Sequence, residues 1–121
     1  MSNIFSDNKT DIFLTSSGVV SVSSGQETTI THDIPVNGWF NGVDYECDNR
    51  NIEDTVTFGI YHPVAGLIKN FAEDVSVRKQ AFYSFYAAKA IQGLQIKITY
   101  KNNGTNDIKF AANIHYHKNR E

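Results

Sequence analysis

Several residue types that would indicate a function are scarce in this chain of 121 residues. The single cysteine, Cys47, cannot form an intramolecular disulfide, which excludes the disulfide framework of many small secreted domains. No apolar run approaches the roughly 20 residues of a membrane-spanning helix. The net charge of -2 provides no large field to attract nucleic acid or an anionic membrane. We therefore expect neither partner, although a local basic patch stays open.

Signals for secretion, catalysis and cofactor binding are also missing. The first ten residues have neither a basic segment nor an apolar one, so we expect a protein made in the cytoplasm. The chain contains no Gly-x-Ser-x-Gly elbow, Walker loop or dinucleotide-binding fingerprint. Its length suits one ordinary domain, without separate cofactor and substrate lobes. These absences predict a protein that is not an enzyme and has no cofactor.

Alternation of apolar and polar residues is the clearest pattern that is present. It runs without error through residues 94–101 and returns through residues 107–117. A period of two is typical of a strand with one buried face. The intervening Asn102–Asn106 segment, NNGTN, consists of residues that tolerate positive φ. The two segments are therefore predicted to pair as an antiparallel hairpin.

The rest of the chain repeats this pattern less regularly. A second hairpin is predicted at residues 55–60 and 67–71. A further strand is predicted at residues 39–47, with Trp39 and Cys47 on its buried side, and more β-structure at residues 18–23 and 26–34. Residues 78–90 fit a strand or a helix, and the strand is favoured because a helix rarely precedes the closing hairpin of such sandwiches.

This pattern predicts an all-β fold: a single antiparallel β-sandwich, jelly-roll-like, with about 7–8 strands. The sandwich would span residues 11–117. We expect a flexible polar N-terminal arm at residues 1–10 and a polar tail at residues 118–121.

Two histidines near the C-terminus suggest a metal site. His115, His117 and Glu121 form the string HxHxxxE, which resembles part of the first motif of the cupins, a jelly-roll metalloenzyme family. The alternation places Ile114 and Tyr116 inside and both histidines outside, opposite to cupin ligands, and no second motif follows. We therefore predict no metal and assign His115 and His117 to an interface, where association would depend on pH. A small cupin-like metalloprotein is kept as the third functional hypothesis.

A run of acidic side chains offers a second candidate for metal binding. Oxygen-rich loops can hold Ca²⁺, but the spacing here does not match an EF-hand, and a solvated strand face explains the run without a metal. The run consists of Asp44, Glu46, Asp48, Glu53 and Asp54.

Exposed aromatic residues provide the alternative functional hypothesis. Phe40 and Tyr61 fall on the side of their strands opposite the predicted core, so both are expected to be exposed. Exposed rings can stack on sugars or contribute to protein interfaces. A carbohydrate-binding or adhesion module is therefore the alternative function.

Four features mark the stretch from Asp54 to the C-terminus. They are a strand that ends in His62–Pro63, a return strand with Phe71, the segment Gly93–Asn102 with the pattern Gly-Leu-x-Ile-x-Ile-x-Tyr-x-Asn, and a last strand that contains Asn113 and His117. In these features the stretch resembles small accessory virion proteins of tailed bacteriophages.

This resemblance implies a non-catalytic structural subunit of a virion, either a capsid decoration (cement) protein or a head-tail accessory protein. Such a subunit would be made in the host cytoplasm and incorporated into the virion. Its partners would be major capsid, neck or tail proteins, and a homo-oligomer is expected. Ile4 and Phe5, apolar residues in the polar N-terminal arm, are predicted to attach to a partner.

Overall fold

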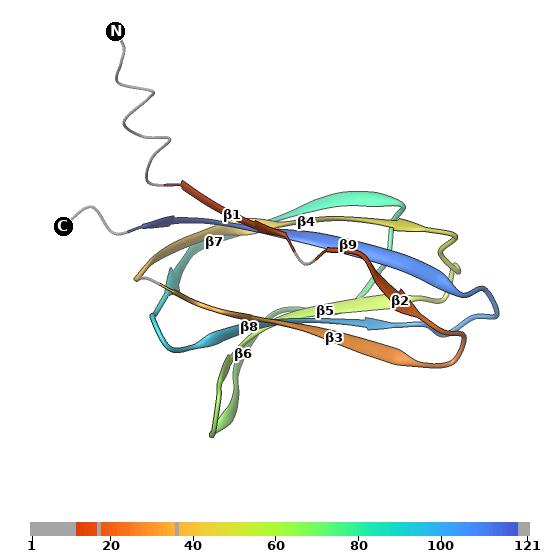
Figure 1. Cartoon of the computed structure of the whole chain (residues 1–121), viewed down its shortest axis with the longest axis horizontal. Helices are drawn as coiled ribbons and strands as arrows, with labels where there is room; N and C mark the ends of the chain where they lie inside the picture. Colours follow the sequence, from red (N-terminus) through yellow and green to blue (C-terminus); the bar gives the residue numbers. More distant parts are fainter. Residues whose placement is uncertain (1–11, 17, 36, 119–121) are drawn as a thin grey trace, which may run out of the picture.

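The computed structural model describes residues 12–16, 18–35 and 37–118, and the regular elements within these ranges are all β-strands (Figure 1). They are β1 (Ile12–Ser16), β2 (Val20–Val22), β3 (Glu27–Asp33), β4 (Gly38–Asp48), β5 (Thr55–His62), β6 (Gly66–Ser76), β7 (Gln80–Ala90), β8 (Gln95–Lys101) and β9 (Ile108–Lys118). The predicted arm and most of the predicted tail lie outside the described residues.

The strands form two antiparallel sheets that stack into a sandwich (Figure 1). One sheet has the order β1-β9-β4-β7, with β2 also paired to β9, and the other has the order β3-β8-β5-β6. From β2 onward the chain changes sheet at every connection except β5–β6, as in a jelly roll. The predicted all-β sandwich is confirmed. The number of strands is higher than predicted because β1 and β2 are separate strands that pair with different parts of the same edge of β9.

One predicted hairpin is confirmed and the other is wrong. β5 and β6 pair with each other, whereas β8 pairs with β3 and β5 and β9 pairs with β1, β2 and β4. Alternation identifies a strand but does not show whether the following connection stays in the sheet or crosses to the other one. Residues 80–90 form the strand β7, which confirms the favoured reading of that segment.

At the start of β4, the buried and exposed side chains are the opposite of those that the sequence predicted. The register of β4 against both neighbours shifts between Phe40 and Gly42, which marks a β-bulge. Phe40 is therefore buried, with 1% of its surface exposed, while Trp39 is 41% exposed. The prediction for these two residues is wrong because it assumed strict alternation along the whole strand. The extra residue at the bulge exchanges the buried and exposed faces of β4 for the residues before it.

The core lies between the two sheets and is rich in aromatic side chains. The ring centroids of Tyr45 and Phe110 are 5.5 Å apart, and those of Tyr100 and Phe110 are 5.1 Å apart. Such tilted contacts between large rings stabilise a core beyond the burial of their area. Other fully buried members are Val43, Val56, Phe58, Ile96, Ile98 and Ile108.

A buried polar network closes one end of the sandwich. We call this the pinned end, where the β2–β3, β4–β5, β6–β7 and β8–β9 connections meet. The carboxyl group of Asp54, which is 0% exposed, accepts hydrogen bonds from the Asn51 backbone N–H at 3.0 Å and the Tyr100 hydroxyl at 2.6 Å. Asn51 Nδ2 donates to Asn102 Oδ1 at 2.9 Å, and Asn102 Nδ2 donates to the Val22 carbonyl at 3.0 Å. The carboxyl group of Asp54 thus links the β4–β5 connection to strand β8.

Residues of the NNGTN segment belong to this network instead of forming a hairpin turn. The Asn103 N–H donates to Asp54 Oδ1 at 2.8 Å, and the Asn106 N–H donates to Asn51 Oδ1 at 2.9 Å. At Gly104, a Cβ atom would lie 2.2 Å from Asn51 Cγ, so this position requires glycine. Burial and the hydrogen bond to Asp54 raise the pKa of Tyr100, which keeps its hydroxyl a donor.

Replacing Asp54 by alanine is expected to lower the free energy of unfolding by about 3 kcal/mol, because it leaves several buried donors without an acceptor. Urea unfolding followed by circular dichroism measures this change. Glu53→Ala is the matched control, because Glu53 is exposed, and should change stability by less than about 0.5 kcal/mol. Equal stability of the two variants would contradict the role assigned to Asp54.

Candidate functional site

Exposed apolar side chains gather at the end of the sandwich opposite the pinned end. We call it the loop end, where the β3–β4, β5–β6 and β7–β8 connections lie. Of the seven large apolar side chains exposed among the described residues, five belong to it: Trp39, Val64, Leu67, Ile68 and Ile91. A concentration of exposed apolar surface is typical of a binding region.

The β5–β6 hairpin projects from the loop end, away from both sheets (Figure 1). Its pairing register shifts at three places, and such irregularities bend and twist a strand pair. We call residues 62–68 the hairpin tip. The ring of His62 accepts hydrogen bonds at Nδ1 from the Val64 and Ala65 N–H groups, both at 3.0 Å. The turn that carries Val64 is therefore held in one shape.

Tyr61 lies at the base of the hairpin tip. Its ring occupies space beside Gly59, where an added Cβ would lie 3.2 Å from Tyr61 Cε1 and 2.5 Å from Asn70 Oδ1. Lys97 Nζ lies 4.9 Å from the centroid of the Tyr61 ring. Because Phe40 is buried in the core, the predicted pair of exposed rings for sugar stacking does not form.

Lysine side chains accompany the aromatic residues of the loop end. Lys69 Nζ lies 5.7 Å from the centroid of the Phe71 ring, and Lys89 Nζ lies 5.8 Å from that of Trp39. The sequence contains no aspartate or glutamate from residue 55 to residue 72. The described loops of the loop end, together with the strand residues next to them, contain one carboxylate, Asp33. The same segments contain the lysines Lys69, Lys89, Lys97 and Lys118.

The predicted histidine site is described only in part. His115 Nε2 contacts Asp44 Oδ2, and Asn113 Nδ2 donates a hydrogen bond to Asp44 Oδ1 at 2.9 Å. His117 is paired with Trp39 across β4 and β9, and its side chain lies outside the described residues. Ile4 and Phe5, the predicted attachment residues of the arm, also lie outside them.

The predicted acidic run is divided between different surroundings. Asp54 belongs to the buried network and Asp44 contacts His115. In the part of the chain that the structure describes, no three or more His, Cys, Asp or Glu side chains are grouped so that they could hold a metal ion.

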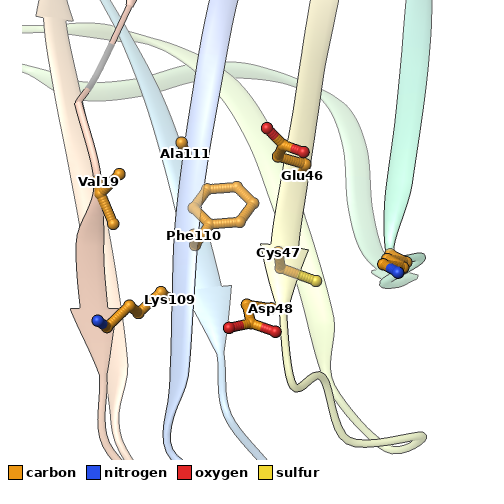
Figure 2. A pocket seen from close by; sticks show the side chains of 8 residues that line it. Val19, Glu46, Cys47, Asp48, Lys109, Phe110 and Ala111 are labelled. Carbon is orange, nitrogen blue, oxygen red and sulfur yellow. The ribbon is translucent and has the colours of Figure 1, made fainter.

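A hollow of about 370 Å³ lies near the pinned end on the five-stranded sheet (Figure 2). Glu46 and Asp48 from β4 line it together with Lys109 from β9, and Ala111 leaves space beside them. Lys79 adds a second ammonium group. Because carboxylates and ammonium groups are equal in number here, the lining does not select a ligand of one charge.

Cys47 also borders this hollow but is a core residue. It is 4% exposed, its thiol donates to the Arg78 carbonyl at 3.3 Å, and burial raises its pKa. A buried thiol with a raised pKa is a poor nucleophile.

We therefore expect iodoacetamide at about pH 8 to alkylate Cys47 at least about a hundredfold more slowly in the folded protein than in urea. In the folded protein the thiol reacts only when the surrounding structure opens by local unfolding. Mass spectrometry of quenched samples measures both rates. Similar rates in the two states would show that the thiol is accessible, contrary to its position in the structure.

Comparisons with known proteins identify no family. No family model matches the chain, and no curated protein matches it. A similar solved structure is the crystal structure of the Yersinia pseudotuberculosis-derived mitogen, with 16% sequence identity, 90% of each chain covered and a TM-score of 0.48.

These findings correct the predicted function. The similar structure is a bacterial mitogen and not a virion protein, which contradicts the predicted capsid decoration or head-tail accessory role. The features that carried the resemblance to phage proteins mark the strands β5, β6, β8 and β9 of the jelly roll, so they describe a fold pattern instead of a functional site.

The exposed side chains of the hairpin tip were not singled out from the sequence. Leu67 and Ile68 are adjacent, so one of them breaks the alternation, and both are about half exposed, at 52% and 55%. An apolar pair on both faces of a predicted strand, together with the long stretch that lacks carboxylates, is the signal that could have identified this surface.

Proposed function

We propose that the protein is a non-catalytic binding domain that docks on the surface of a lipid bilayer through the hairpin tip. The observation that carries this proposal is the exposure of Val64, Leu67 and Ile68, at 90%, 52% and 55%, on a projecting hairpin. A narrow convex tip can enter the boundary between headgroups and acyl chains, where its side chains leave water without a preformed protein groove.

The size of the tip fits reversible association. Full burial of a Val, Leu or Ile side chain contributes about 1.5–3 kcal/mol, and these three side chains would each recover part of that amount. Part of the gain offsets the loss of motional freedom on binding. No helix in the described ranges is long and apolar enough to cross a membrane, and docking by a hairpin requires none.

The proposal departs from the expectation that no membrane is a partner. That expectation rested on the net charge of -2, which is a sum over the whole chain. Among the described residues the charges are separated, because lysines predominate at the loop end while most carboxylates lie elsewhere. A local basic patch, left open by the sequence, therefore coincides with the exposed apolar side chains.

The double variant Leu67→Asp/Ile68→Asp should lose at least about tenfold in affinity for vesicles of phosphatidylcholine containing about 30% phosphatidylserine, because charged side chains do not enter the acyl boundary. Co-sedimentation over a range of lipid concentrations measures the affinity. Ile52→Asp is the matched control, since Ile52 is 84% exposed but lies at the pinned end, and it should bind like the unmodified protein.

Circular dichroism establishes that each variant is folded before binding is compared. Failure of the unmodified protein to bind these vesicles would contradict the proposed function. Equal binding by the folded double variant would show that another surface contacts the lipid.

A further inference from the structure

We infer that the hairpin selects bilayers with anionic phospholipids over neutral ones, through Lys69 and Lys97 at its base. This inference rests on the proposed function and assigns the lipid class that the hairpin tip would take.

The order of side chains along the hairpin matches the layers of a bilayer surface. Val64 lies in the turn, Tyr61 pairs with Leu67 further back, and Ile60 pairs with Lys69 beyond them. Gly59, one residue further from the turn than Ile60, pairs with Lys97 of β8. A hairpin that enters turn first therefore brings aliphatic groups to the acyl boundary, an aromatic ring to the interface, and ammonium groups to the phosphates.

The two lysines are held close to this path. Lys97 Nζ lies 4.9 Å from the centroid of the Tyr61 ring, and Lys69 Nζ lies 5.7 Å from that of Phe71. These contacts favour positions of both ammonium groups beside the rings while leaving them able to donate hydrogen bonds to phosphate.

Neighbouring carboxylates do not neutralise these lysines. The two ion pairs found among the described residues are Lys101–Asp74 and His115–Asp44, and neither involves Lys69 or Lys97. Asp33, the carboxylate that the described residues place at the loop end, instead accepts a hydrogen bond from Gln95 Nε2 at 2.9 Å. The positive charge of the hairpin base is thus available to an anionic surface.

The test compares vesicles of phosphatidylcholine alone with vesicles that also contain about 30% phosphatidylserine, at low and moderate salt. A basic residue close to an anionic membrane contributes about fivefold in affinity, so two should give a preference of roughly 25-fold, which decreases as salt screens the charges. Lys69→Gln/Lys97→Gln should remove this preference while retaining the weaker binding to phosphatidylcholine.

A charge-matched control separates the local effect from that of net charge. Lys79→Gln/Lys109→Gln removes the same two charges near the pinned end, and it should retain the preference. Loss of the preference in this control as well would overturn the assignment to the hairpin. So would a preference that inorganic phosphate abolishes at constant ionic strength, because it would indicate capture of free anions.

The remaining outcomes distinguish this inference from the proposed function. Equal binding of the unmodified protein to both vesicle types would overturn the anionic preference but leave docking through the hairpin tip intact. Binding to neither type would contradict both. Sedimentation velocity provides a further criterion: self-association that disappears in Leu67→Asp/Ile68→Asp, without vesicle binding, would identify the hairpin tip as a protein interface and overturn both.

Discussion

The carboxyl group of Asp54, buried where four connections meet, is the interaction on which the arrangement of the two sheets depends. A carboxyl group without contact to water is costly unless donors surround it. Donors from Asn51, Tyr100 and Asn103 surround it here. They belong to the β4–β5 and β8–β9 connections and to β8 itself. Satisfying one acidic side chain therefore fixes two of the crossings between the sheets, β4–β5 and β8–β9, relative to each other.

This constraint makes the two ends of the sandwich different. The pinned end uses its polar side chains internally, because Asn51 and Asn102 are buried and donate to backbone carbonyls of the β8–β9 connection and of β2. The loop end has exposed aliphatic side chains and lysines, and its hairpin extends away from the sheets (Figure 1). A rigid scaffold with exposed residues on one projecting element is typical of a domain that acts by binding. The proposed bilayer contact follows from this difference.

Much of the fold follows from the sequence because strand alternation is a local property. The strands β5, β8 and β9, the β5–β6 hairpin and the all-β class were all predicted from it. The crossing between β8 and β9 was not predicted, because it depends on the contacts of Asn102 with Asn51 and of Asn103 with Asp54, which form only in the folded chain. Phe40 was misplaced because strict alternation was assumed from residue 39 to residue 47, although Asn41-Gly42 marks the position of the bulge.

The candidate site was less predictable for a related reason. Alternation shows which side chains share a face, but not whether the opposite sheet covers that face. β6 is an edge strand, and its first residues extend beyond the sandwich, so Leu67 and Ile68 are exposed despite their apolar character. Amide hydrogen exchange with and without anionic vesicles tests the central claim most directly. Docking through the hairpin tip predicts slower exchange confined to the loop end, strongest from Val64 to Ile68; slower exchange centred on the pinned end, or no change anywhere, would contradict it.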